Sequence, residues 1–320
     1  MLRYGMVVVL VALVVATAIL DSSFLDSNNL LNLLLEWAPV GIMAIGMTYV
    51  IISGGFDLSV GGVYAMGGVI FAGVAQHQPV WLALLAALAA GAVIGVANGV
   101  IITRLDVNPF VATLGTGFII RGLALVATAA TPILVSKAGF TVLGADKIGP
   151  FPIPAVILVV GLLIGGFVLS RTIYGTGIFA VGGNEESSRL SGLPTRRLRA
   201  STYVLTGLGA ALAGCILASR LGSGQADVGA NIELDVITVV VVGGTALMGG
   251  DGAMWRTAVG IAILAVLGNA FDRLQISPFW QLVIKGAIIV FAIAADSYAK
   301  KRAARARREE RRPAAETSTT

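Results

Sequence analysis

Long apolar runs dominate this chain, and short polar interruptions divide them into segments of near-membrane length. The runs are apolar on every face instead of striped at helical spacing, which is typical of transmembrane helices. They cover residues 6–20, 38–53, 60–76, 80–103, 110–131, 153–170, 200–219, 235–248, 256–271 and 278–297. We therefore predict an all-α, polytopic membrane protein with about ten transmembrane helices.

The first run permits two interpretations. It follows Arg3, and Ala16-Thr17-Ala18 near its end resembles a signal-peptidase site, so one interpretation is a cleaved signal. We favour a retained span that starts near Tyr4. The next stretch, residues 21–36, contains acidic residues but no Lys or Arg and is expected to form a polar connection.

The longest polar interruption covers residues 171–199 and contains five arginines and two glutamates. Part of it has the signals of a short helix: an Asn cap, acidic residues in the first turn, a basic residue in the last turn, then Gly and Pro. In chain order these residues are Asn184, Glu185, Glu186, Arg189, Gly192 and Pro194. A helix this short is marginal alone, so we expect it to dock on a partner. The alternative is a solvated loop whose arginines only orient the chain.

Two glycine-rich segments interrupt the apolar pattern, SGGFDLSVGG at residues 53–62 and GGTALMGGDG at residues 243–252. Unwound backbone at membrane depth is tolerated only where protein or water satisfies its polar groups. One interpretation is an element of a path or gate, and the other is a tight turn with Asp57 or Ser59 capping the next span. The two segments also suggest two pseudo-repeated halves, residues 38–131 and 200–297.

Other polar residues fall within or beside the spans. Arg121 and Lys285 are cations inside predicted spans and need a polar partner, a polar path or an interface within reach. Four further residues are candidates for hydrogen bonds between helices, and the second of them precedes a proline that suits a first helical turn. They are Asn98, Asn108, Thr113 and Asn269. The candidate path or gate residues are Gly55, Asp57, Ser59, Asn108, Thr113, Gly244 and Thr245.

Composition supports a membrane protein and excludes several other classes. Of 320 residues, 57% are hydrophobic and 12% are charged, against about 25% charged in a typical soluble domain. The single Cys215 cannot form an internal disulfide, and the single His77 makes no metal site. The net charge of +5 comes with no motif or basic face for nucleic acid.

The cations indicate how the chain is oriented. With the N-terminus inside, sixteen Lys and Arg fall in inside segments and four in outside segments, which is a strong positive-inside bias. We predict that both termini are cytoplasmic. Residues 1–299 would form the membrane domain and residues 300–320 a basic tail, disordered or lying on the membrane surface.

No catalytic constellation is present in the sequence. It has no G-x-x-x-x-G-K-[ST] phosphate loop, no H-E-x-x-H, and no Ser/His/Asp set that one histidine could complete. We predict a transport protein without a cofactor of its own and not an enzyme. An ATPase that powers it would be a separate chain that binds the ATP.

Several stretches in register together resemble the ribose-type permeases of ABC transporters, within the branched-chain amino acid/ribose permease superfamily. They are Gly46-Met47-Thr48, residues 55–61 (GFDLSVG), residues 108–115 (NPFVATLG), Tyr174-Gly175-Thr176-Gly177, residues 180–184 (AVGGN), Ser191-Gly192, Gly243-Gly244-Thr245, Met248-Gly249-Gly250 and residues 277–281 (SPFWQ). The resemblance covers residues 38–297. Two residues depart from it, Phe56 in place of a small aliphatic residue and Asp251 in place of a basic or small one.

The resemblance implies a fold similar to the permease of the cobalamin importer, the type II ABC permease fold. It implies a second permease subunit, identical or different, two cytoplasmic ABC ATPase subunits, and a periplasmic or lipid-anchored sugar-binding protein. It also assigns contact with the ATPase to the stretch 171–199. The matching positions are Asn184, Glu185, Ser188, Arg189, Ser191 and Gly192.

We therefore expect the permease subunit of an ATP-driven importer in a bacterial cytoplasmic (inner) membrane, which translocates a monosaccharide or a sugar-like solute. Ribose, xylose and galactose represent the expected class, and the sequence does not select among them because selectivity would reside in the binding protein. The alternative is a secondary, ion-coupled transporter. That class places ion-coupling carboxylates in its spans, and Asp57 is the one plausible candidate here.

Overall fold

The computed structural model describes residues 5–288, 290 and 294. The chain forms two compact units, unit 1 (Met1–Leu274) and unit 2 (Gln275–Thr320). Unit 2 is helical over residues 278–288, which confirms a helix in the first part of the last predicted span. The tail predicted at residues 300–320 lies outside the described residues.

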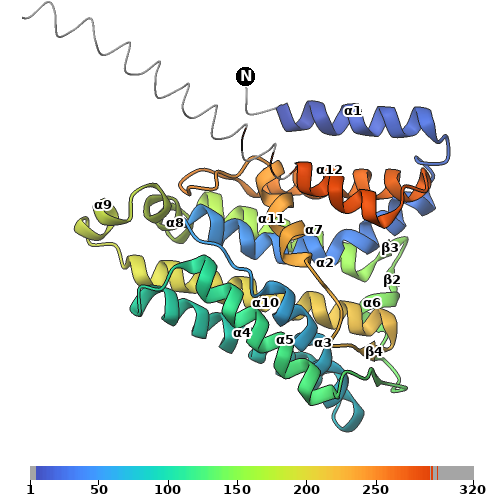
Figure 1. The fold of residues 1–320 in the computed structure, drawn as a ribbon, viewed down its shortest axis with the longest axis horizontal. Coiled ribbons are helices and arrows are strands. Elements are labelled where there is room, and N and C mark those ends of the chain that lie inside the picture. Colours follow the sequence, from blue (N-terminus) through green and yellow to red (C-terminus); the bar gives the residue numbers. More distant parts are fainter. Residues whose placement is uncertain (1–4, 289, 291–293, 295–320) are drawn as a thin grey trace, which may run out of the picture. The chain divides into compact units, whose positions relative to one another are not determined.

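Helices make up most of unit 1 (Figure 1). Their bounds are α1 Gly5–Leu20, α2 Ser27–Ile52, α3 Val60–His77, α4 Val80–Arg104, α5 Pro109–Thr128, α6 Val142–Ala145, α7 Ile153–Arg171, α8 Ile173–Gly183, α9 Glu185–Leu190, α10 Thr195–Leu221, α11 Ile232–Val242 and α12 Met254–Arg273. Six of them, α2, α4, α5, α7, α10 and α12, are long and apolar enough to cross a membrane. A polytopic helical protein is thereby confirmed, while the total of ten spans stays a prediction.

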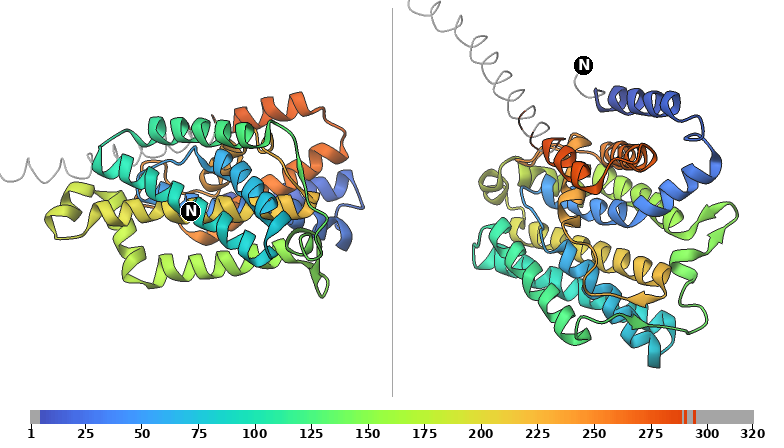
Figure 2. Two further views of the ribbon diagram at one scale, coloured as in Figure 1. Left: turned by 90° about the horizontal axis from the view of Figure 1, so that it is seen from below. Right: turned by 45° about the vertical axis from the view of Figure 1, so that its right-hand side comes forward.

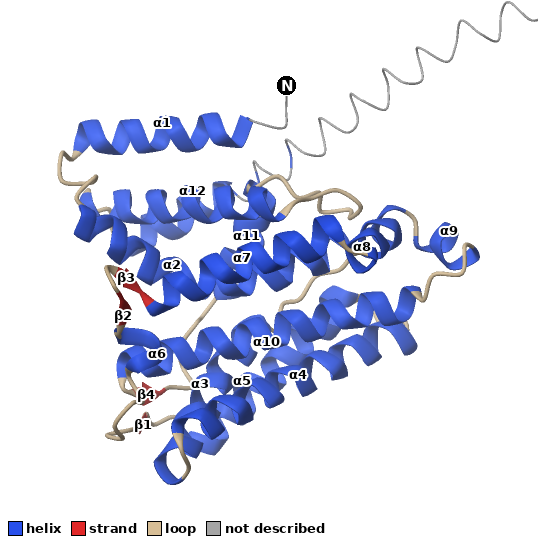
Figure 3. Ribbon diagram, turned by 180° about the vertical axis from the view of Figure 1, so that it is seen from behind, coloured by secondary structure: helices blue, strands red, loops and turns tan. Residues whose placement is uncertain are grey.

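Four two-residue strands pair into two small antiparallel sheets. Strand β1 (Ile133–Leu134) pairs with β4 (Ser223–Gly224), and β2 (Lys147–Ile148) pairs with β3 (Phe151–Pro152). Figure 3 shows both sheets at the end of unit 1 opposite α8 and α9. The long helices therefore run between these two ends of unit 1.

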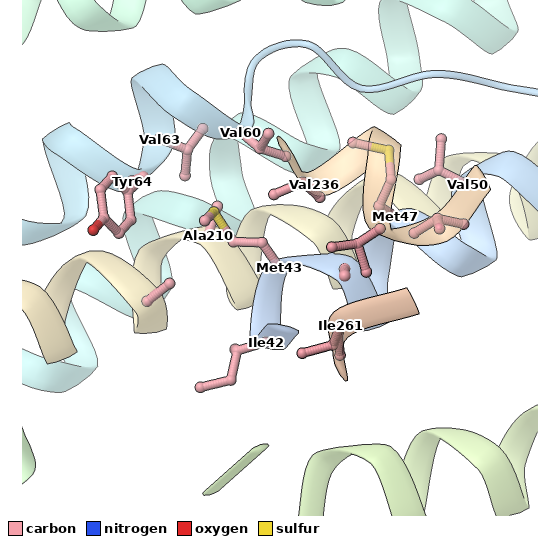
Figure 4. Packing of buried hydrophobic residues seen from close by; sticks show 14 of the residues in the cluster. Ile42, Met43, Met47, Val50, Val60, Val63, Tyr64, Ala210, Val236 and Ile261 are labelled. Atoms are coloured by element: carbon pink, nitrogen blue, oxygen red, sulfur yellow. The ribbon is translucent and has the colours of Figure 1, made fainter. Parts of the chain in front are cut away.

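Helix α10 is the central helix of unit 1 and packs on α2, α3 and α4. The main buried cluster joins these helices to α11 and α12, as Figure 4 shows for Met43 and Met47 of α2, Tyr64 of α3 and Ala210 of α10. Close packing of α2 on α10 depends on a small residue, because a Cβ at Gly46 would lie 2.6 Å from the Cα of Thr206.

Glycines at four-residue spacing form the contact between α4 and α10. Gly91, Gly95 and Gly99 all lie on the face of α4 that meets α10, and a Cβ at Gly95 would lie 2.7 Å from the Cα of Val204. Small residues at this spacing let two helix backbones approach closely within a membrane. The glycine content of this chain is thus used here for helix packing.

The structure corrects three of the predicted boundaries. Residues 27–36 are not a polar connection but the first part of α2, which begins after Asp26. The predicted span 235–248 is wrong in length, because α11 ends at Val242. The backbone leaves the helical conformation at Gly244, which has φ +94°. The stretch 171–199 is largely helical, because it contains α8, α9 and the start of α10. Within α8 the side chains of Ile178 and Val181 are buried.

An ion pair ties the α1–α2 connection to the end of α12. Asp21 accepts hydrogen bonds from Arg273 and from the hydroxyl and amide of Ser23. Arg273 also donates to Asn269, which is hydrogen-bonded to Asn29 of α2. The hydrogen bonds from Arg273 and then Ser23 lower the pKa of Asp21 from 3.8 to about 2.

This ion pair predicts an acid-dependent contribution to stability. A carboxyl whose pKa is lowered by folding stabilises the fold above its unfolded pKa, and that stabilisation is lost as the pH falls through the folded pKa. We expect wild type to melt at a higher temperature than Asp21→Asn at pH 5 and above, with the difference vanishing between about pH 4 and pH 2. Thermal unfolding in detergent checks this, and a difference that persists at pH 2 would contradict it.

Large apolar side chains cover much of the surface of α5 and α7. Phe118 and Val126 of α5 are 69% and 81% exposed, and Leu163 and Phe167 of α7 are 68% and 63% exposed. A soluble monomer rarely exposes contiguous apolar surface on this scale. These faces suit contact with lipid or with another membrane-spanning chain.

Candidate functional site

Helix α9 is a short helix with a complete cap at each end. The side chain of Asn184 accepts a hydrogen bond from the amide of Ser187 at 2.8 Å. At the other end Gly192 has φ +83° and the amides of Gly192 and Leu193 donate to Arg189 O and Ser188 O, which is the Schellman arrangement. The predicted helix is confirmed, including the roles of Asn184 and Gly192 as caps.

The surface of α9 is charged and its remaining candidate residues differ in exposure. Glu186 pairs with Arg189 across an exposed turn at 2.7 Å, and this hydrogen bond and the positive charge of Arg189 lower the pKa of Glu186. Ser188 is buried, whereas Ser191 is exposed and donates to Ser187 O. α9 therefore presents a polar outer face while one side chain packs inward.

Glu185 connects α9 to the beginning of α10. Its Oε2 lies 3.0 Å from Nη1 of Arg199, and Nη2 of the same guanidinium donates to Gly54 O at 3.2 Å. Figure 2 shows α9 at the end of unit 1 where α10 begins. One arginine thus contacts α9 and the residues that follow α2.

The first glycine break, residues 53–59, connects α2 to α3 (Figure 1) and has a turn at each end, at residues 53–54 and 58–59. Its buried end is held by side chains from two other helices. Asp57 accepts from the amide of Ser59 at 3.0 Å and from its hydroxyl, and Nδ2 of Asn98 in α4 donates to Ser59 Oγ at 2.8 Å. Thr113 of α5 accepts from the amide of Leu58 at 3.0 Å. The buried end of the break is therefore held by hydrogen bonds to α4 and α5.

Three backbone segments meet in a glycine junction formed by Ile52, Gly182, Gly249 and Gly250. The amide of Gly250 donates to Ile52 O at 2.9 Å. A Cβ at Gly182 would overlap that carbonyl oxygen and lie 2.8 Å from the amide nitrogen of Gly250, and a Cβ at Gly249 would lie 3.0 Å from Gly54 Cα. The junction joins the end of α8 to both glycine-rich segments.

The second glycine break, residues 243–253, separates α11 from α12 and is held by Arg256. The Nη1 of Arg256 donates to Gly244 O at 3.1 Å and lies 3.3 Å from Asp251 Oδ1. Asp251, one of the two departures from the family pattern, thus has a structural partner. Thr245 is buried, and its Oγ1 makes no hydrogen bond among the described residues.

The structure gathers most of the predicted path or gate residues, but not all of them. Asp57, Ser59 and Thr113 lie in one hydrogen-bonded group, and Gly55 lies in the same break. Gly244 and Thr245 lie in the second break, which meets the first at the glycine junction. Asn108 stands apart: it is exposed, and its side chain caps α5 by accepting from the amide of Phe110 at 2.9 Å.

The structure shows the hydrogen-bond partners of several other polar residues that were predicted within the spans. A hydrogen bond between helices, as predicted, is present for Asn269 of α12 with Asn29 of α2, whereas Asn98 of α4 bonds to Ser59 in the first glycine break. Arg121 donates to the backbone oxygens of Val228 and Gly229, at 3.2 and 2.7 Å, so backbone carbonyls satisfy this cation. Lys285 lies in unit 2.

Sequence reasoning missed the residues that connect these elements. The sequence pattern counts Arg199 and Arg256 among the cations that orient the chain and predicts no partner for either. Tyr203, one turn beyond Arg199, is fully buried, and a Cβ at Gly55 would overlap its hydroxyl. One signal in the sequence is the position of Arg199 directly before the apolar run 200–219. A cation near the positive end of a helix is not stabilised by the helix dipole, so it is expected to have another partner.

The comparisons with known proteins agree with one another. The family model of the branched-chain amino acid transport system / permease component matches residues 29–293. The ribose import permease protein RbsC of Bacillus subtilis is 42% identical over 92% of this chain and 93% of its own. The L-arabinose transport system permease protein AraH of Escherichia coli is 39% identical, over 93% and 92%, and the probable ABC transporter permease protein YphD of Escherichia coli is 38% identical, over 95% and 92%. No solved structure matches the chain.

Proposed function

Because the chain belongs to the permease family of the branched-chain amino acid transport system, we propose that it is the membrane subunit of an ABC importer for a monosaccharide. It is a transport component and not an enzyme. The relatives named above support a sugar as the solute, since they are described as permeases for ribose and for L-arabinose. An ion-coupled transporter is not favoured by these relatives.

The observation that carries the proposal is the capped helix α9 at one polar end of unit 1. Its caps fix a six-residue helix that would be marginal alone. Its outer face is charged, and Glu185 links it through Arg199 to the first glycine break. We propose that an ABC ATPase subunit docks on the face formed by Asn184, Glu185, Arg189, Ser191 and Gly192, and that Ser188, which is buried, supports this face from within.

The orientation follows from the same docking. An ATPase that uses cytoplasmic ATP requires α9 to face the cytoplasm, and the positive-inside count of the sequence agrees with this. Both termini would then be cytoplasmic, and the end with the two small sheets would face the binding protein. A second permease subunit would contribute the other half of the path, against exposed apolar faces such as that of α5.

The two glycine breaks supply the moving part in this proposal. They meet at the glycine junction directly beside the end of α8, the helix that leads into α9. Gly55, Asp57, Ser59, Thr113, Gly244 and Thr245 are the proposed residues of the path or gate. The role of Asn108 in it is limited to ending the loop before α5, because its side chain serves as a helix cap.

The double variant Glu185→Gln, Gly192→Val tests the docking. It removes the link to Arg199 and forces a β-branched residue into a left-handed backbone conformation, at a cost of roughly 1–2 kcal/mol. We expect normal membrane insertion, loss of co-purification with the ATPase, and at least a ten-fold fall in ATP-dependent uptake of D-ribose or L-arabinose by proteoliposomes.

The matched control is Gly222→Val, which alters another left-handed C-cap glycine, at the far end of α10. Its φ is +67° and its Cβ would meet open space, so the local strain is comparable. We expect this variant to keep the ATPase. Normal uptake by the double variant would overturn the proposed docking face.

A further inference from the structure

Arg199 occupies a position that its own helix does not explain. It lies in the second turn of α10, on the side of the positive end of the helix, so the helix dipole does not stabilise its charge. Its side chain is 17% exposed, against 46% for its partner Glu185. A largely buried guanidinium in such a place is stabilised by its partners and not by the helix that carries it.

Those partners belong to two elements that are far apart in the sequence. Nη1 lies 3.0 Å from Glu185 Oε2 on α9, and Nη2 donates to Gly54 O, 3.2 Å away, in the first glycine break. The planar fork of arginine can hold two such groups at a fixed separation, whereas the ammonium of lysine is a single point charge. Arg199 therefore fixes the distance between α9 and Gly54.

The contact at Gly54 leads directly to the buried end of the break. Gly54 has φ +83° and lies three residues before Asp57. From Asp57 the hydrogen bonds continue to Ser59 and then to Asn98 of α4. A shift of α9 that pulls Arg199 would thus act on the one end of the break that is not held by α4 or α5.

The second break lacks such a connection among the described residues. Arg256 also binds a left-handed glycine carbonyl, that of Gly244, but its acidic partner Asp251 belongs to the same break. Arg256 therefore joins two residues of the same break, Gly244 and Asp251. The acidic partner of Arg199, by contrast, lies on α9, so Arg199 links a break to a separate helix.

We propose that Arg199 is a positioning residue that transmits movement of α9 to the first glycine break through Glu185 and Gly54. The inference rests on the proposed function, because the movement of α9 would come from the docked ATPase. Without Arg199 the ATPase would still bind and hydrolyse ATP, but its motion would not reach the break. The expected defect is uncoupling and not loss of assembly.

The test compares Arg199→Gln with Arg197→Gln in the assembled complex. Arg197 is an exposed arginine in the first turn of the same helix, so the control makes the same charge change. For Arg199→Gln we expect ATP hydrolysis within two-fold of wild type and sugar uptake reduced at least ten-fold. Arg199→Lys keeps the charge but loses the fork, and we expect an intermediate uptake. Arg197→Gln should behave as wild type.

Hydrogen–deuterium exchange gives a readout that a purely structural role would not change. In the wild-type complex, trapping with ATP and vanadate should alter exchange in residues 184–192 and also in residues 53–59. In Arg199→Gln the first change should persist and the second should disappear. A second change that persists would overturn the proposal, and so would loss of ATPase binding, because Arg199 would then act in docking. Failure of the wild-type chain to bind an ATPase would instead refute the proposed function.

Discussion

Gly182→Ala should abolish uptake and strongly reduce the yield of folded protein. The added Cβ would overlap the carbonyl oxygen of Ile52 and lie 2.8 Å from the amide nitrogen of Gly250. Both are backbone atoms, so no flexible side chain can turn away. The hydrogen bond from Gly250 N to Ile52 O, 2.9 Å long, lies in the same place and would be broken. Overpacking usually costs 1–3 kcal/mol, and we expect about 3 kcal/mol or more here.

The neighbouring residue supplies a matched control for this prediction. A Cβ at Gly183 would meet nothing within 4 Å, although Gly183 is the last residue of the same helix. Gly183→Ala should therefore melt close to wild type and retain uptake. Size-exclusion chromatography of the solubilised protein after heating compares the two variants. Equal melting temperatures would contradict the tight junction seen between α8 and the two glycine breaks.

Gly95→Ala is expected to separate α4 from α10. The new methyl group would lie 2.7 Å from Val204 Cα and overlap Tyr203 O, and both atoms belong to the α10 backbone. The contact is central to unit 1 because Gly91 and Gly99 pack on the same helix one turn to either side. Because backbone atoms cannot turn away from the methyl group, α4 and α10 would have to move apart along their whole contact. We expect a loss of at least 2 kcal/mol of stability and a large fall in the amount of folded protein.

Gly122→Ala is the control, because it makes the same substitution within helix α5. A Cβ at Gly122 would meet nothing within 4 Å. In a water-exposed helix alanine is favoured over glycine by about 1 kcal/mol, so this variant should be neutral or more stable. Equal melting temperatures of Gly95→Ala and Gly122→Ala would show that α4 and α10 do not pack through their glycines.

Tyr203 lies one helical turn beyond Arg199 on α10. Tyr203 is fully buried, and its hydroxyl interacts with the guanidinium of Arg199. A Cβ at Gly55 would overlap this hydroxyl, so Tyr203 and Arg199 both lie against the start of the first glycine break.

The sequence by itself determined the class of the protein and much of its local structure. Uniformly apolar runs of near-membrane length are typical of membrane-spanning helices, so the polytopic helical class could be predicted without tertiary information. The caps of α9 were equally readable, since Asn184 and Gly192 act on their own neighbours in the chain. Motifs in register then placed the chain in its family, which the comparisons confirmed.

Only the tertiary structure decided what the polar interruptions do. Pattern reasoning left the segment after α2 open between a turn and a gate, because its partners Asn98 and Thr113 come from α4 and α5. The meeting of Gly182 with Gly250 and the link from Glu185 through Arg199 to Gly54 join residues that are distant in the sequence. The same pattern of glycines and cations fits many arrangements, and helix packing selects one. Local interactions are encoded within a few residues, whereas these contacts exist only when α2, α8 and α10 have packed together.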